Sequence, residues 1–284
     1  MFDVFTNRLE ITGTLENLTA LRIGIGRSND AIGTDLPVIK DSLGNPLIPG
    51  SSFKGALRAR LESFLRAIDE TLAQDPAALV SEAYTNAVRV HKQTHKDNDA
   101  ALTAALLKLT DPISQVFGSP WLAGKLQIRD LSVTADTWFG QYQERDGVII
   151  DRDTETSGNK YDFQVVPAGT QFEFMAIIEN AHDWELGLLM LGLHQFETAQ
   201  VPLGGGRSRG LGAVELAITQ TRWWDVRQDN GKPDPSKVYD YIRQVASGSA
   251  PPSATDITAL KRQWGEALVT HLNTAVEQIE VPAS

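Results

Sequence analysis

Short alternating segments and two longer segments of helical spacing make up most of the first 221 residues. Residues 4–14 alternate in part and are rich in β-branched side chains, which predicts a first strand. Residues 126–133 alternate as a further strand, and residues 165–178 predict a strand pair around a Pro-Ala-Gly-Thr turn. Residues 213–221 predict the last strand.

Two helices complete this pattern. Phe53, Leu57 and Leu61 recur at helical spacing, and the serines before them predict an N-cap at 51–52. Residues 181–199 predict a second core helix. The order is therefore β-α-β-β-α-β, which predicts an α+β fold with a ferredoxin-like or RNA-recognition-motif (RRM-like) core.

Three further segments lie outside this order. Residues 69–115 predict a helical insertion, and the polar stretch 139–164 predicts a hairpin. After residue 221 come two predicted helices, over 238–246 and 255–278. We therefore expect a core over 1–221 with two insertions, and a C-terminal helical extension over 222–284.

Composition excludes several kinds of site. The 284 residues include no cysteine, so a disulfide scaffold, a thiolate zinc site and a cysteine nucleophile are ruled out. No apolar run reaches the 18 or so residues of a membrane span, and the first residues lack the pattern of a signal peptide. We expect a soluble, cytoplasmic protein that has no membrane partner.

The net charge of −10 by itself argues against binding to nucleic acid. The charge is uneven, however, because residues 1–68 hold eight Lys/Arg against seven Asp/Glu, and residues 201–224 hold three against one. Since binding footprints are local, an acidic protein can still carry a basic groove in these two segments.

Residues 203–212 combine five glycines with two arginines. Glycine lets a backbone approach a ligand closely, and arginine forms forked bonds to phosphate. The segment lacks the Gly-Lys-Ser/Thr ending of a nucleotide-binding loop and precedes a strand, which argues against a triphosphate site. Two interpretations stay open, a loop along an extended nucleic-acid backbone and a flexible helix–strand connection.

The predicted helix start at 48–58 is a second candidate site. Its free N–H groups, two serines, a lysine and an arginine suit an anion. Plain capping followed by a solvated basic face is the alternative. Gly55 lies in the helix despite its low helix propensity, so close packing or the approach of a ligand would explain it.

An aspartate in the long loop after the first strand is a third candidate. Asp35 lies between Gly33 and Pro37, and it suits acid–base chemistry or the positioning of a metal near a phosphate. Asp30 and Asp41 are nearby competitors. The alternative is that the aspartate only forms a turn.

Together these segments resemble the RAMP superfamily, and more closely the backbone (Cas7-like) subunit of type III CRISPR effector complexes. The resemblance rests on six stretches in the order in which that family has them: 30–41, 47–58, 117–126, 149–154, 166–170 and 203–212.

The resemblance implies a subunit that binds guide RNA (crRNA) and stacks with its neighbours, each copy covering about one six-nucleotide segment. The hairpin at 139–164 would act as a thumb that splays one nucleotide pair of the guide–target duplex. The implied RNA-binding residues are Arg22, Ser51, Ser52, Lys54, Arg58, Gly204, Gly205, Gly206, Arg207, Ser208 and Arg209. Arg22 stands where close relatives often carry a histidine, and it cannot titrate near pH 7.

By the same resemblance Asp35 is the catalytic residue for cutting complementary target RNA. The implied chemistry is a metal-dependent endoribonuclease reaction in which the target's own 2′-hydroxyl attacks, giving a cyclic phosphate. Mg²⁺ or another divalent metal would be held weakly by Asp35 and substrate phosphate. Further implied partners are paralogous backbone subunits, a large Cas10-like subunit and small subunits.

Two other functions stay open at this point. Some relatives lack the aspartate and only hold guide RNA, so a non-catalytic structural subunit is one alternative. A guide-processing endoribonuclease is the other, but such enzymes usually rely on a cluster of histidine, tyrosine or lysine, and none stands out. Tyr161 and Phe163, beside the hairpin, suit either base stacking or strand packing.

Overall fold

The computed structural model describes residues 3–24, 36–150, 157–247, 256–276 and 279. Its centre is a four-stranded antiparallel sheet in the order β3-β7-β1-β8. The strands are β1 (Asn7–Asn17), β3 (Leu126–Ile128), β7 (Gln171–Glu179) and β8 (Val214–Asp225). An α+β fold is therefore confirmed.

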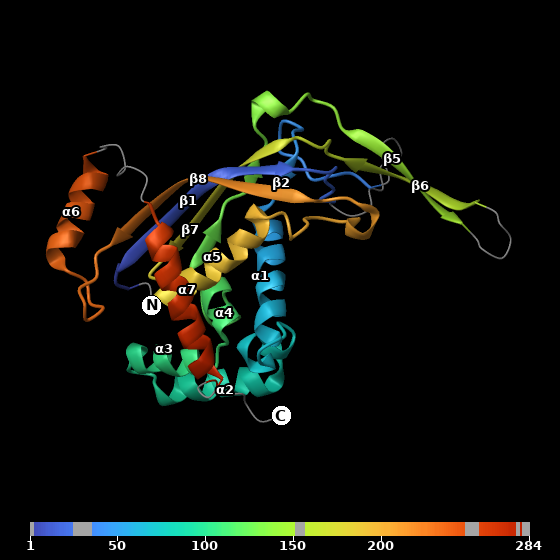
Figure 1. Ribbon diagram of the computed structural model, residues 1–284. Coiled ribbons are helices and arrows are strands. Elements are labelled where there is room, and N and C mark those ends of the chain that lie inside the picture. The colour runs from blue at the N-terminus through green and yellow to red at the C-terminus, as the bar shows by residue number, and fades with distance from the viewer. Residues whose placement is uncertain (1–2, 25–35, 151–156, 248–255, 277–278, 280–284) are drawn as a thin grey trace.

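One face of this sheet is covered by helices (Figure 1). The helices α1 (Gly50–Arg66) and α5 (Asp183–Glu197) pack there against the inward-facing residues of the strands. Phe53 of α1 stacks on Phe196 of α5 with their ring centroids 4.3 Å apart. This contact places the first turns of α1 beside the end of α5, from which the glycine-rich loop departs.

The start of α1 differs from the sequence prediction. The N-cap is Pro49, and neither Ser51 nor Ser52 caps the helix, so the predicted serine cap is wrong. The carboxylate of Asp130 accepts the first N–H instead, at 2.8 Å from the Gly50 nitrogen. A Cβ on Gly50 would lie 2.3 Å from the Ile128 carbonyl oxygen, so only glycine permits this approach.

The predicted strand over 126–133 is divided into two. β3 ends at Ile128, and β4 (Leu131–Ser132) pairs with β2 (Leu47–Ile48), while the residues on either side of β4 stay bonded to β7. The division falls beside the residues that receive the start of α1, since Asp130 accepts the Gly50 N–H and the Ile128 and Arg129 carbonyl groups lie against Gly50.

The insertions are a helical layer and a projecting hairpin (Figure 1). The helical layer contains α2 (Glu82–Thr94), α3 (Asp99–Lys108) and α4 (Pro112–Phe117), with short 3₁₀ turns at Glu70–Leu72 and Ala78–Val80. A further 3₁₀ turn, Ala135–Thr137, precedes the hairpin. The hairpin pairs β5 (Gln143–Ile150) with β6 (Ser157–Val165), and it extends away from the sheet.

The last helix is part of the core. α7 (Thr258–Ala275) packs along α5 and buries Trp264, against which Trp223 of β8 packs edge-on at 5.4 Å. A Cβ on Gly187 of α5 would lie 2.2 Å from the Trp264 carbonyl oxygen. The two helices therefore approach at backbone distance, and residues beyond 221 help to complete the core.

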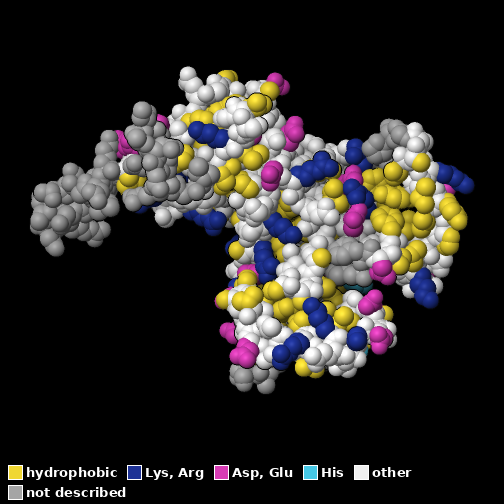
Figure 2. All heavy atoms as spheres, turned by 180° about the vertical axis from the view of Figure 1, so that it is seen from behind, with side chains coloured by type: hydrophobic (Ala, Val, Ile, Leu, Met, Phe, Trp, Pro, Cys, Tyr) yellow, Lys and Arg dark blue, Asp and Glu magenta, His cyan; other side chains and the backbone are white. Residues whose placement is uncertain are grey.

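α6 (Pro235–Ala246) lies at the opposite side of the molecule from the hairpin. Its contacts with the body include the stacking of Tyr241 on Phe5, at 4.7 Å. Tyr239, Ile242 and Val245 are exposed, and Figure 2 shows hydrophobic side chains gathered over this helix. None of the helices in the described ranges has the length and hydrophobicity that crossing a membrane requires.

Candidate nucleic-acid interface

Three segments that are far apart in the sequence meet beyond the ends of β1 and β8. Arg22 follows β1, and its carbonyl oxygen accepts the N–H of Gly205 in the glycine-rich loop at 2.8 Å. On the other side, Leu21 pairs with Val166 after β6, and Leu36 pairs with Phe163 within β6. These backbone bonds hold the loop, the segment after β1 and the base of the hairpin together.

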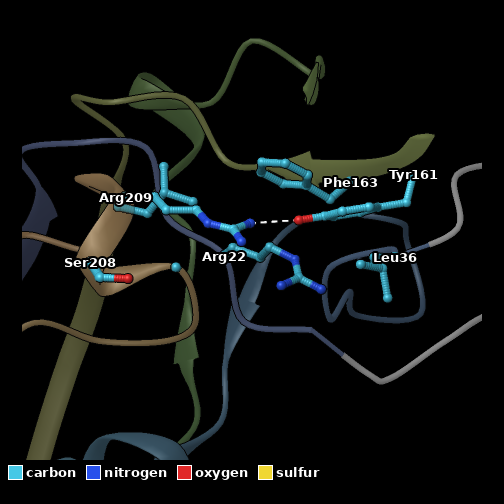
Figure 3. A pocket seen from close by; sticks show the side chains of 8 residues that line it. Arg22, Leu36, Tyr161, Phe163, Ser208 and Arg209 are labelled. Atoms are coloured by element: carbon cyan, nitrogen blue, oxygen red, sulfur yellow. Dashed lines mark hydrogen bonds between the residues drawn. The ribbon is translucent and has the colours of Figure 1, made fainter. Parts of the chain in front are cut away.

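The three segments enclose a pocket of about 500 Å³ (Figure 3). Its lining is half polar and half apolar: Arg22, Leu36, Tyr161, Phe163, Gly206, Ser208, Arg209 and Leu211. Four of the predicted RNA-binding residues, Arg22, Gly206, Ser208 and Arg209, therefore share one cavity. The two aromatic residues that the sequence left undecided between stacking and packing lie there as well.

The pocket and its rim carry positive charge. The guanidinium of Arg209 donates to the Tyr161 hydroxyl at 2.6 Å, and that of Arg207 donates to the Gly204 carbonyl at 3.1 Å. The Arg22 guanidinium lies 5.6 Å from the centre of the Phe163 ring. Among the described residues, none of these three arginines forms an ion pair with a carboxylate, so their charge is available to an anion.

Most glycines of this loop are explained by the loop itself. Gly204, Gly206, Gly210 and Gly212 have φ between +75° and +83°, which favours glycine over other residues. A Cβ on Gly204 would also lie 2.1 Å from the Arg22 carbonyl oxygen. Gly205 has neither a positive φ nor a close backbone neighbour in the described structure. The arginines and Gly205 thus carry the argument for a ligand, and the other glycines shape the turn.

The basic residues of α1 do not line this pocket. The Lys54 ammonium donates to the Leu126 carbonyl at 2.7 Å. Burial, followed by the neighbouring Arg58 charge, lowers its pKa. Arg58 pairs with Glu62 at 2.7 Å and donates to Gly118 at 3.1 Å. Both side chains therefore point toward β3 and α4 rather than toward the glycine-rich loop.

Small residues lie on the exposed side of α1 near its start. Ser51 and Gly55 are exposed, Ser52 is half-buried, and a Cβ on Gly55 would meet no described atom within 4 Å. The described packing therefore gives no reason for glycine at position 55. Of the two explanations expected from the sequence, close packing is not supported by the described residues, and the approach of a ligand stays a prediction.

Asp35 lies outside the described residues, as does Asp30. The next residue, Leu36, lines the pocket, and its N–H donates to the Asp162 carbonyl at 3.2 Å. Asp41 is described, and its carboxylate accepts the N–H groups of Asn45 and Leu43, each at 2.8 Å. The Asn45 bond is the main cause that lowers the pKa of Asp41. Asp41 is therefore a turn former.

A comparison with family models matches residues 14–215 to the RAMP superfamily. The chain belongs to the RAMP superfamily. The match ends within β8, so α6 and α7 lie beyond it. The resemblance inferred from the motifs is confirmed at this level.

Three relatives of this RAMP protein share the name "CRISPR system Cms endoribonuclease Csm3". The Enterococcus italicus relative is 27% identical over 217 residues, 75% of this chain and 91% of its own length. The Methanothermobacter thermautotrophicus relative is 24% identical over 250 residues, 84% of this chain and 95% of its own length. The Mycobacterium tuberculosis relative is 46% identical over 71 residues, 24% of this chain and only 30% of its own length.

The described residues of this RAMP chain show no cluster of metal-ligating side chains. They contain no group of three His, Asp or Glu side chains that could hold an ion. Asp35, the predicted ligand, is outside the described ranges and offers one carboxylate. A bound Mg²⁺ ion therefore stays a prediction.

Sequence reasoning missed Leu36, Gly147 and Leu211 in this region of the RAMP fold. Gly147 of β5 is paired with Tyr161 of β6, and a Cβ there would lie 2.2 Å from the Tyr161 ring. A glycine within a predicted strand is a signal of such a close approach. Leu36 and Leu211 lie in two of the stretches that carry the resemblance, but an isolated leucine in a loop does not indicate that it lines a pocket.

Proposed function

We propose that this RAMP protein is the crRNA-binding backbone subunit of a type III CRISPR effector complex and cuts complementary target RNA with Asp35. The supporting observation is the pocket that gathers Arg22, Ser208 and Arg209 from separate segments beside Leu36, the residue after Asp35. Two relatives that carry the name endoribonuclease support the proposed nuclease activity. Guide RNA, target RNA and further complex subunits are the proposed partners.

We propose further that the sheet is a ferredoxin-like core. Its open face, the one that the helices leave uncovered, does not bind the RNA. β1, β7 and β8 turn alternate residues away from the helices, and these include five glutamates and two arginines. They are Glu10, Glu16, Glu173, Glu179 and Glu215, with Arg8 and Arg222. RRM domains stack bases on aromatics of this face. In this protein the acidic charge of the open sheet face repels phosphate. The RNA is therefore proposed to run along the glycine-rich loop instead.

The pocket supplies what strand cleavage by an internal hydroxyl requires. Arg22 would neutralise charge as the 2′-oxygen bonds to phosphorus and the 5′-oxygen leaves. Asp35 would accept the 2′-hydroxyl proton, and a proton reaching the 5′-oxygen completes the reaction. The products are a 2′,3′-cyclic phosphate and a 5′-hydroxyl. A divalent ion, when bound, would add to the neutralisation of the phosphate charge.

Loss of the loop arginines is expected to weaken guide retention. Arg207→Ala and Arg209→Ala each remove one phosphate contact, so the slope of log affinity against log salt should fall by about 1 for each. The measurement is RNA retained by the assembled particle at increasing salt. Arg262→Ala is the matched control, because Arg262 is an 85% exposed arginine on α7. Retention identical to wild type in both loop variants, or a native particle free of RNA, would refute the proposal.

Gly55→Ala is expected to separate fold stability from RNA binding. Alanine should raise the unfolding free energy by roughly 0.5–1 kcal/mol, because the helix gains propensity and no described atom clashes. Guide retention should nevertheless fall, because the methyl group lies where the RNA backbone would approach. Gly265→Ala in α7 is equally unobstructed and should give the stabilisation alone. Equal guide retention in the two variants would assign Gly55 no role in binding.

A further inference from the structure

We propose that His271 makes the docking of α7 sensitive to pH: the helix packs firmly on the core while this imidazole is neutral and loosens when it gains a proton. α7 lies beyond the family match, and none of its residues lines the pocket at the glycine-rich loop, so this device does not depend on the proposed function. Three features carry it: the place of the ring, the cavity beside it, and the pairing of the carboxylates at the start of α5.

The His271 ring lies between α7 and the start of α5. It stacks on Trp184 with the ring centroids 4.0 Å apart and the planes 9° apart. Its Nε2 atom is buried and has no hydrogen-bond partner among the described residues. Protonation puts an N–H on both ring nitrogens, so this atom would become a buried donor without an acceptor. Stacking on Trp184 tolerates a cation, since aromatic faces attract one, and the penalty therefore arises at the nitrogen and its surroundings.

The cavity beside the ring offers no counter-charge. It has about 250 Å³, and its lining comes from α3, α4, the start of α5 and α7, where the end of α7 meets the helical layer (Figure 1). Besides His271, its charged or titratable lining residues are Lys108 of α3 and His182 before α5, and none of the described lining residues is a carboxylate. Burial, followed by the neighbouring His182, lowers the pKa of His271.

The carboxylates at the start of α5 already have cations. Glu185 holds the Lys125 ammonium at 2.5 Å, and Asp183 holds the Arg227 guanidinium at 3.1 Å. The second oxygen of Asp183 accepts the Gln263 amide of α7, also at 3.1 Å. An imidazolium at this junction would therefore add a positive charge to pairs that are already balanced. The N-terminal end of α5 opposes a cation as well, because the helix dipole is positive there.

The direction of the pH effect follows from proton linkage. A histidine released into solvent has a pKa of about 6.5, and the pKa of docked His271 is lower, so the loosened state binds the proton more readily. Docking is therefore strongest above about pH 6.5 and weakens as the pH falls below that value. Between pH 7.5 and 5.5 the docking equilibrium can fall by up to about 10-fold, the limit that one histidine sets.

The test is hydrogen–deuterium exchange of the full chain at pH 7.5 and 5.5, with each rate divided by the intrinsic rate at that pH. We expect the protection of α7 amides to fall several-fold at pH 5.5 relative to those of β1 and β7 in the same sample. His271→Phe keeps a ring for Trp184 and cannot gain a proton, so most of this fall should disappear. His194→Gln is the matched control and should leave the fall unchanged, because His194 is a 62% exposed histidine on α5.

Three outcomes would overturn the proposed device. The first is equal relative protection of α7 at both pH values in the wild type, whatever the variants do. The second is an undiminished fall in His271→Phe, because another group would then be titrating. If that variant does not fold, the assigned imidazole resonances of the wild type decide. His271 must titrate at a lower pH than exposed His194, and the reverse order is the third outcome.

Discussion

Asp35→Ala is expected to abolish target RNA cleavage at the position of this subunit while guide loading stays at the wild-type level. Removing a residue that transfers a proton in the transition state costs about 10²- to 10⁴-fold in rate. Guide loading should persist, because a carboxylate repels phosphate and the RNA contacts are assigned to other residues. The measurement is the ladder of products from end-labelled complementary RNA, together with the RNA content of each particle.

The neighbouring aspartates make this experiment specific. Asp41→Asn is the matched control, because the Asp41 carboxylate serves its own turn and asparagine can keep the two N–H bonds. Asp30→Ala tests the other competitor in the same loop. Unchanged cleavage in Asp35→Ala would refute the catalytic role of Asp35 and favour a purely structural RNA-binding subunit. A loss of guide RNA in that variant would instead assign Asp35 a role in assembly.

The cleavage products also separate this function from guide processing. A processing enzyme would cut free repeat RNA at one site as an isolated chain. The pocket described here instead lies beside a hairpin and a loop that suit an extended strand. Site-specific cleavage of repeat RNA by the isolated protein would contradict the proposed function, whatever the behaviour of Asp35→Ala.

The elements of the fold followed from local patterns, but their junctions did not. The stripe at Phe53, Leu57 and Leu61 predicted α1, because packing on a sheet demands that spacing. The stripe contains no information on Asp130, which is 80 residues from Gly50 and caps the helix. The predicted strand is interrupted at residues 129–130, where this contact is made. A serine cap was predicted instead, since sequence reasoning saw only adjacent residues.

The candidate site was predictable residue by residue but not as a whole. Arg22, Ser208 and Arg209 were identified, and the structure places them in one pocket. The segment after β1 is joined to β6 by pairings such as that of Leu36 with Phe163. These two residues are more than 100 positions apart, so no local spacing could have predicted the contact. Lys54 and Arg58 were predicted to bind RNA, with a solvated basic face as the alternative, because they fall off the apolar stripe. In the structure their side chains bond to β3 and to the end of α4. The spacing of apolar residues within α1 could not predict these contacts with other elements.

Lys125→Met is expected to be the most destabilising single substitution that we propose. The Lys125 ammonium lies 2.5 Å and 2.8 Å from the two Glu185 carboxylate oxygens, with the side chains 4% and 0% exposed. Removing the cation leaves a carboxylate buried without its counter-charge, which costs about 3–5 kcal/mol. The measurement is the unfolding free energy of the full chain from urea titration.

A double-mutant cycle isolates the pair from the other role of Glu185. Its carboxylate also accepts the His182 N–H at 2.7 Å, which caps the start of α5. Glu185→Gln keeps an acceptor there and removes the charge, so Lys125→Met with Glu185→Gln should recover most of the lost free energy. The double variant retains the capped helix without the buried charge. A cost below about 1 kcal/mol for Lys125→Met alone would contradict this account, because a residue without structural importance costs that little.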